Sequence, residues 1–501
     1  MTARRLYLAV GAAAAIVYLG VLWNGFALDD VTIIFANPLV HQLSGVWRAF
    51  AAPYFPPNLD TSVYRPLVVA TYALDWLTGS TVWFHVVNLA WHVAASVLVA
   101  VLGRRWAGEA AGLVAGIVFA VHPVHVEAVA NVVGRNELMA AVFTLLALYA
   151  ALERESVLLS AAALAAGLLS KENAAVAPAL VVGAWLLGVR PVPPPRKLAA
   201  FAASWLVLAG SYVAIRWTVL HGFGGRNVAA AFLGQDPSTI PLTAVAALAD
   251  VARLLLFPLA LSADYSPDER TAVHTLLDVR FVVGFLVLTL WALLLGEAWR
   301  RKQVRGVEAL GLGWIAVAYA PVANLLFPVQ IIVAERTLYL PSAGLALATG
   351  ALLRRLPGRG LAAVVGLVFV LGGVRTALRV PAWRDDHAAA LALLHDAPRS
   401  YFTWQNLGWQ YLRLGQFAKA LEAFQVSSRI YPRDARVYIA AAHAAYALDR
   451  AATADSLLTR ADAACERCVT YYRNQAWFAR LRGDSASADS LLAHAHRLRP
   501  S

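Results

Sequence analysis

Two adjacent carboxylates, Asp29 and Asp30, directly follow the first long apolar run of the sequence. A carboxylate beside a bilayer and near a cluster of cations suits a general base that faces an anionic lipid substrate. The alternative is a structural role, in which the two aspartates cap a helix or close a turn. We favour the catalytic interpretation and predict that this pair supplies the base.

Other ionisable and polar residues lie at the ends of apolar runs, on what we predict to be one side of a membrane. An ionisable residue at membrane depth costs at least about 2.5 kcal/mol, so each one is a functional candidate. The predicted substrate contacts are cations, histidines and a tyrosine at these ends: Arg65, His85, His122, His125, Arg135, Lys171, Arg336 and Tyr339. Charges that converge on one membrane face are what a site at the interface needs.

Many of these positions also have a structural interpretation. His85, Asn88 and His92 fall at i, i+3 and i+7 on one helix face, where hydrogen bonds between helices are at least as good an explanation. His122 and His125 resemble part of a metal site, but no tetrahedral ligand set with clean spacing accompanies them, so we predict no metal. The nearby acids are expected to pair with arginine or lysine and hold the fold: Glu127, Glu137, Glu172 and Glu335.

The composition places these residues in a membrane protein. Hydrophobic residues make up 60% of the 501 residues, charged residues only 14%, and the mean hydropathy is +0.61, whereas a soluble domain is about one quarter charged. Apolar runs continue to about residue 380 and then stop. We therefore predict a membrane domain at 1–380, a linker at 381–400 and a soluble domain at 401–501.

Membrane-spanning helices are expected wherever about 20 apolar residues follow one another. This rule gives about eleven candidates, with 157–170 and 173–189 forming either a hairpin or one interrupted helix. The candidates are 6–23, 81–102, 108–124, 136–152, 157–170, 173–189, 198–219, 281–298, 308–327, 337–353 and 360–377.

Lysine and arginine in the short loops predict the orientation, because cytoplasmic loops are enriched in both. Clusters such as Arg104 with Arg105, and Arg300 with Arg301, fall in alternate loops and predict a cytoplasmic N-terminus. These clusters also explain most of the net charge of +12 better than nucleic-acid binding does. An odd number of spans then places the soluble domain on the non-cytoplasmic side. In a prokaryotic cell the membrane would be the inner or cell membrane.

The soluble domain carries a repeat of 34 residues. From Tyr401 onward, the first period has its aromatic, small and proline residues at tetratricopeptide positions, and two later periods are degenerate but in register. The first period contains Trp404, Leu407, Gly408, Tyr411, Ala420, Phe424 and Pro432. We predict three helix hairpins that bind an extended peptide or another protein, the alternative being that they only cap or stiffen the molecule. Cys465 and Cys468 form either a local disulfide or two idle thiols, and the second is favoured.

Several motifs resemble the transmembrane-and-tetratricopeptide (TMTC) O-mannosyltransferases. The resemblance extends in order over nearly the whole chain and includes the C-terminal repeats. It rests on LDD at 28–30, YRPL at 64–67, FHVVN at 84–88, HPVHVE at 122–127, VGRNE at 133–137, LLFPLALSADY at 255–265 and AERTLYLPS at 334–342.

The resemblance implies an all-α fold of the GT-C glycosyltransferase type, with about eleven spans and the repeat domain. It also implies that a sugar, mannose by analogy, passes from a polyprenyl-phosphate donor to Ser or Thr of a protein on the non-cytoplasmic face. The acidic motif of the family falls on Asp29 and Asp30. Inversion needs one base and cations for the departing phosphate, with no cofactor. Arg135, Lys171 and Arg336 are the phosphate candidates, and Arg65 is as well suited to orienting an aspartate.

Two other functions compete with this one. A non-catalytic scaffold could anchor tetratricopeptide repeats to a membrane for envelope or glycan assembly, but it would not need Asp29, Arg135 and Arg336 on one face. A transporter would carry polar residues near the middle of the membrane and show inverted repeats. The polar groups of this sequence lie at one edge, which favours the enzyme. The tail is shorter than the repeat arrays of animal relatives, so their acceptors are not carried over.

Overall fold

The computed structural model describes residues 2–56, 63–222, 228–266, 269–464 and 469–498, and these residues contain helices and no strands. The predicted all-α class is confirmed. The chain forms two compact units, one of residues 1–263 and 272–389 and one of residues 264–271 and 390–501. The short segment 264–271 thus joins the C-terminal unit from the middle of the chain, which sequence patterns did not indicate.

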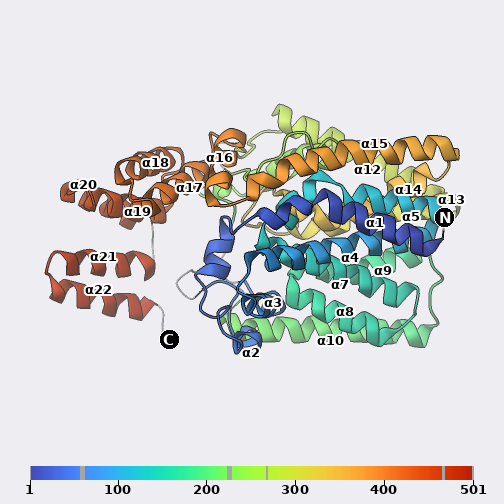
Figure 1. The fold of residues 1–501 in the computed structure, drawn as a ribbon, viewed down its shortest axis with the longest axis horizontal. Coiled ribbons are helices and arrows are strands. Elements are labelled where there is room, and N and C mark those ends of the chain that lie inside the picture. Colours follow the sequence, from blue (N-terminus) through green and yellow to red (C-terminus); the bar gives the residue numbers. More distant parts are fainter. Residues whose placement is uncertain (1, 57–62, 223–227, 267–268, 465–468, 499–501) are drawn as a thin grey trace. The chain divides into compact units, whose positions relative to one another are not determined.

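The first unit is built from long apolar helices (Figure 1). Its main helices are α1 (Ala3–Val17), α3 (Pro66–Trp76), α4 (Thr81–Ala107), α5 (Glu109–Ala120), α6 (Val126–Ala130), α7 (Arg135–Leu152), α8 (Val157–Ser170), α9 (Ala177–Leu186), α10 (Pro195–Leu220), α11 (Thr239–Leu256), α12 (Val279–Arg300), α13 (Lys302–Tyr319), α14 (Tyr339–Leu353) and α15 (Gly358–Arg379). Short helical turns join them: η1 (Leu19–Trp23), η2 (Val31–Phe35), α2 (Gly45–Arg48), η3 (Ala49–Ala51), η4 (Pro123–His125), η5 (Val132–Gly134), η6 (Glu172–Val176), η7 (Ala230–Phe232), η8 (Ala320–Val322), η9 (Glu335–Leu338) and η10 (Val380–Trp383).

All eleven apolar runs form helix, and α8 and α9 are separate helices connected by η6. By length and composition, six helices of the described chain can cross a membrane, or seven if the bent pair Glu109–Ala120 and Pro123–Ala130 is one span. The chain is a multi-pass membrane protein, and its count of eleven spans stays a prediction. One of the six is α11, which the sequence rule missed because Asp250 and Arg253 interrupt its apolar run.

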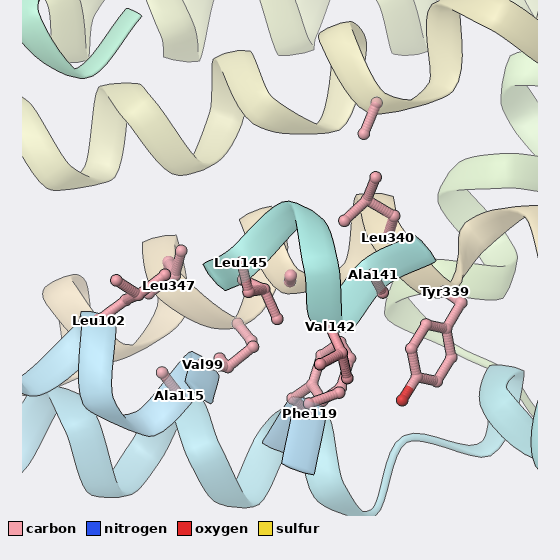
Figure 2. Packing of buried hydrophobic residues seen from close by; sticks show 14 of the residues in the cluster. Val99, Leu102, Ala115, Phe119, Ala141, Val142, Leu145, Tyr339, Leu340 and Leu347 are labelled. Atoms are coloured by element: carbon pink, nitrogen blue, oxygen red, sulfur yellow. The ribbon is translucent and has the colours of Figure 1, made fainter. Parts of the chain in front are cut away.

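A core of apolar side chains joins the central helices of the first unit. Val99 of α4, Phe119 of α5, Leu145 of α7 and Leu347 of α14 come together in it (Figure 2). Small residues allow the close helix contacts that membrane helices need, because lipid supplies no hydrophobic force between helices. At the α13–α14 crossing, a Cβ on Gly311 would collide with the backbone of Gly344, and the reverse holds as well. Burial of this kind fixes the helix ends that carry the polar residues.

The second unit contains three helix hairpins. Their helices are α17 (Tyr401–Arg413) with α18 (Phe417–Ile430), α19 (Ala435–Tyr446) with α20 (Ala451–Ala463), and α21 (Val469–Leu481) with α22 (Ser485–Leu498). Gly408 of α17 lies against the ring of Phe424 of α18, where a side chain would collide with that ring. The first helices of successive hairpins start at 401, 435 and 469, as a 34-residue repeat requires. Their identity as tetratricopeptide units, and the boundaries at 380 and 401, stay predictions.

The helix α16 (Asp386–Asp396) runs from the first unit into the second. Inside the second unit, the Arg399 backbone N–H donates to Glu269 Oε1 at 2.9 Å, and Ser400 donates to Asp264. These bonds explain why segment 264–271 belongs with the hairpins. The pair Cys465 and Cys468 lies outside the described residues.

Candidate active site

The two aspartates of the first loop lie in opposite environments. After η1 the chain turns, and Asp30 immediately precedes the helical turn η2. The side chain of Asp30 is completely buried, whereas the neighbouring Asp29 is exposed. Adjacent residues of one loop therefore have different roles available to them.

Asp30 connects two loops through backbone hydrogen bonds. Its Oδ1 accepts the Val133 N–H at 2.8 Å, and its Oδ2 accepts the Val132 and Ala27 N–H groups, each at 3.2 Å. Asp30 lies outside the apolar spans, and burial raises its pKa to about 7, although these three hydrogen bonds oppose the shift. The carboxyl of Asp30 thus joins the first loop to the 131–134 turn through hydrogen bonds. It has no exposed oxygen that a substrate could contact.

Asp29 keeps its carboxylate available. Within the described part of the chain, no hydrogen bond or ion pair occupies this side chain. The charge of Asp29 does act on Arg336. The pKa of the Arg336 guanidinium is raised mainly by the charge of Glu127 and further by that of Asp29, whereas burial lowers it. An exposed carboxylate with no partner among the described residues is free to accept a proton from an alcohol.

Three of the predicted cations form ion pairs with acids. Arg336 of η9 pairs with Glu127 of α6, and its backbone N–H donates to the same carboxylate at 2.8 Å. Lys171, just after α8, pairs with Glu137 of α7. Arg65, which precedes α3, pairs with Glu172 of η6 at 3.4 Å.

The three cations differ in access. The Arg336 side chain is 36% exposed, that of Arg65 is 16% exposed and that of Lys171 is 9% exposed. Burial lowers the pKa of Lys171, and the positive charge of Arg65 lowers it further. The negative charge of Glu137 opposes this shift. Arg336 is therefore the cation best placed to meet an incoming anion, with Arg65 and Lys171 deeper.

Arg135 is placed differently from the other cations. It is fully buried, and its guanidinium pairs with Asp75 of α3 and donates to Asn88 Oδ1 at 2.8 Å, to Thr71 at 3.1 Å and to the Phe84 carbonyl at 3.0 Å. With its donors used in this way, Arg135 is better suited to holding the site than to touching a phosphate. The sequence showed a conspicuous arginine beside a helix start but could not show that α3 supplies a carboxylate to it.

This buried network supports the turn that Asp30 holds. Asn88 Nδ2 donates to the Asn131 and Val132 carbonyls at 3.2 and 3.1 Å, while Arg135 fixes the Asn88 oxygen. The same turn donates its N–H groups to Asp30. Asp75 is thus a member of the site that sequence reasoning missed, because a single acid near the end of a helix gives no motif.

The histidines and Tyr339 are buried and bonded within the protein. The Nε2 atoms of His85, His122 and His125 contact the Gly25 carbonyl at 3.1 Å, the Leu255 carbonyl at 2.9 Å and the Ser342 hydroxyl at 2.7 Å. The Tyr339 hydroxyl lies 2.8 Å from His92 Nδ1, so the predicted helix-face stripe does make contacts between helices. These contacts favour a structural role for all four candidates.

No group of three or more His, Cys, Asp or Glu residues that could hold a metal occurs among the described residues. The absence of a metal from the reaction stays a prediction.

Comparison with known proteins gives relatives of one kind. No family model matches the sequence. The protein O-mannosyl-transferase TMTC3 of Mus musculus is 26% identical over 462 residues, which cover 83% of this chain and 50% of that protein. TMTC4 of Homo sapiens is 29% identical over 479 residues, which cover 80% of this chain and 63% of that protein.

The chain is similar to the TMTC protein O-mannosyl-transferases over most of its length. The resemblance indicated by the motifs is confirmed. The chain spans between half and two thirds of the length of these TMTC relatives. Among solved structures, ArnT from Cupriavidus metallidurans bound to undecaprenyl phosphate is 14% identical and covers 91% of this chain and 77% of its own, with a TM-score of 0.41. A likeness of that extent defines neither a common fold nor a common ligand.

Proposed function

We propose that this protein is a membrane glycosyltransferase of the GT-C type, which moves mannose from a polyprenyl-phosphate donor to a Ser or Thr hydroxyl of a protein. The observation that supports it best is the exposed Asp29 carboxylate, held by its buried neighbour Asp30 and lying in the field of Arg336. The relatives are named for mannosyl transfer to protein. Their name suggests the sugar and the class of acceptor.

The proposed reaction uses Asp29 as the general base. Its carboxylate takes the proton of the acceptor hydroxyl while the hydroxyl oxygen attacks C1 of the sugar. The bond from C1 to the phosphate oxygen breaks, and polyprenyl phosphate leaves with the electron pair. Attack from the side opposite the phosphate inverts the configuration at C1. The phosphate leaves as an anion, so it needs no second carboxylic acid to protonate it.

Cations stabilise the charge that develops on the leaving phosphate. Arg336 is assigned the first contact because its side chain is the most exposed of the cations in the three ion pairs. Arg65 and Lys171 lie behind it and add positive potential. Arg135, His85, His122, His125 and Tyr339 support the geometry through their contacts within the protein. No metal or other cofactor is required by this chemistry.

The proposed topology places the site and the hairpins on the non-cytoplasmic face, with a cytoplasmic N-terminus. Lys and Arg clusters in alternate loops support this orientation. We assign the hairpins to tetratricopeptide repeats that capture the acceptor protein or an assembly partner. In a bacterial cell the protein would lie in the inner membrane.

The test measures transfer of radiolabelled mannose from polyprenyl-phosphate mannose to a Ser/Thr peptide by the purified full-length protein in lipid nanodiscs. Asp29→Asn is expected to lower kcat by at least about 100-fold. Arg336→Gln is expected to raise the KM for the donor and to lower kcat. Asp385→Asn is the matched control, because Asp385 is a nearby acid whose contacts with Arg384 and Ala388 lie within its own segment.

Three outcomes separate the alternatives. If Asp29→Asn transfers mannose at the wild-type rate, the assignment of the base is wrong. If the wild-type protein transfers no sugar from any polyprenyl-phosphate donor, the non-catalytic scaffold becomes the better interpretation. A divalent-metal requirement that chelation reveals would contradict the metal-free mechanism alone.

A further inference from the structure

Leu28, the residue immediately before Asp29, has an unusual backbone conformation. Its φ angle is +53°, in the left-handed region that residues with a Cβ rarely adopt. A leucine in this region persists only when its surroundings hold it there, and such positions gather at functional sites. Asp29, which is exposed, and Asp30, which is buried, directly follow this residue.

The end of the membrane-helix region holds Leu28 in place. Asp386 Oδ1 accepts the Leu28 N–H at 2.6 Å. Two further bonds join the same segments, since the Gly25 N–H donates to the Arg384 carbonyl at 2.6 Å and Asn24 Nδ2 donates to the Val380 carbonyl at 3.4 Å. Residues 24–28 are thereby tied to residues 380–386, which lie more than 350 positions away in the sequence.

Asp386 is not needed to cap its own helix. Although Asp386 is the first residue of α16, the Ala388 N–H is accepted by Asp385 Oδ1 at 2.8 Å. Asp385 also accepts the side chain of Arg384 at 3.0 Å. Asp385 thus contacts the start of α16, and Asp386 contacts the first loop.

We propose that Asp386 is a positioning residue for the reaction, which holds Leu28 in the left-handed conformation and so aims Asp29 at the substrate. This inference rests on the proposed function, in which Asp29 is the base. Asp386 belongs to the segment by which the chain leaves the membrane helices, so the geometry of the base depends on where that segment lies. Asp386 acts through the Leu28 backbone and does not touch the reacting atoms.

The test uses the full-length protein in nanodiscs and four variants. Asp386→Ala removes the acceptor and is expected to lower kcat by at least 10-fold while the donor KM stays within about 3-fold. Asp386→Asn keeps an amide oxygen for the Leu28 N–H and is expected to retain at least half of the wild-type kcat. Asp385→Asn is the matched control and should keep the wild-type kcat.

The fourth variant tests the backbone conformation directly. Glycine adopts positive φ without steric cost. The double variant Leu28→Gly/Asp386→Ala should therefore have a kcat at least 3-fold higher than that of Asp386→Ala. A purely structural role of Asp386 in α16 would give no such recovery. If Asp386→Ala does not fold, Asp386→Glu takes its place, because it keeps the charge and moves the carboxylate by one methylene.

Amide hydrogen exchange provides a readout that does not depend on sugar transfer. Exchange in residues 24–36 should accelerate in Asp386→Ala and remain at the wild-type rate in Asp385→Asn. Unchanged exchange together with unchanged kcat in Asp386→Ala would overturn the proposal. Faster exchange in a protein whose wild type transfers no sugar would refute the proposed function and leave the role of Asp386 in holding the loop intact.

Discussion

The buried carboxyl of Asp30 should make the stability of the protein depend on pH. Two effects compete at this residue, since burial favours the neutral acid and three backbone N–H groups favour the carboxylate. Burial dominates and raises the pKa from 3.8 to about 7. A group with a raised folded-state pKa binds its proton more tightly in the folded state. Its contribution to stability is therefore complete below about pH 4 and is lost as the pH rises through 7.

The size of the effect follows from the two pKa values. A difference of about 3 pH units at a fully buried group corresponds to roughly 4 kcal/mol over the whole range. Between pH 5 and pH 8, the part that is lost amounts to roughly 2–3 kcal/mol. Asp30→Asn removes the titration, because its amide is uncharged at every pH in this window. From pH 5 to pH 8, the wild type should therefore lose roughly 2–3 kcal/mol of unfolding free energy relative to Asp30→Asn.

The assay is thermal unfolding of the purified protein in detergent at pH 5, 6, 7 and 8, followed by tryptophan fluorescence. The chain has 16 tryptophans to report on it. Asp29→Asn is the control, because it makes the same change of charge at the exposed neighbour and should keep the slope of the wild type. A constant difference between wild type and Asp30→Asn from pH 5 to pH 8 would refute the reasoning. It would mean that the three hydrogen bonds outweigh burial and keep Asp30 ionised throughout.

Three further predictions concern the ion pairs and the absence of a metal. Asp75→Ala leaves the buried Arg135 guanidinium without its carboxylate and should destabilise the protein by about 3–5 kcal/mol. The measurement is the melting temperature, which should fall. An unchanged melting temperature would contradict the structural role of Arg135. Lys171→Met should also destabilise the fold, because it leaves Glu137 buried and unpaired, and it should raise the KM for the donor. The double variant Lys171→Met/Glu137→Gln should regain the wild-type melting temperature but keep the raised donor KM. Restored donor binding in that double variant would exclude Lys171 from the phosphate site. Excess EDTA should leave mannose transfer unchanged, and a loss that added Mg²⁺ or Mn²⁺ reverses would show that a metal takes part.

Much of the fold could be predicted from the sequence because membrane helices leave a strong signal. About 20 apolar residues in a row have few structures open to them in lipid, and every such run is helical. The weaker cases are α3 and α11. The first has only 11 residues, and the second alternates buried and exposed faces as a soluble helix does. A rule that requires about 20 consecutive apolar residues does not identify helices of these kinds.

The candidate site was less predictable, because residue type does not reveal direction. Asp29 and Asp30 are identical in chemistry, so residue type alone could not separate their roles. The structure places one outside and the other at three backbone N–H groups. Arg135 and Arg336 likewise both lie at the start of a helical segment, yet only Arg336 keeps a partly exposed side chain. Asp75 and Asp386 were missed because each acts on a residue distant in sequence.

The contrast between the two aspartates also bears on why both are acids. A base needs its charge, and a charged carboxylate on the next residue would repel that charge. Burial raises the pKa of Asp30 to about 7, so Asp30 carries little charge below that pH. Asp29 is exposed and lies in the field of Arg336. Asp30 can therefore anchor the loop without competing for the cation. If the pair worked as two equivalent bases, each single Asp→Asn variant would keep part of the transfer activity. With divided roles, Asp29→Asn should abolish transfer at every pH, whereas Asp30→Asn should change stability and its pH dependence.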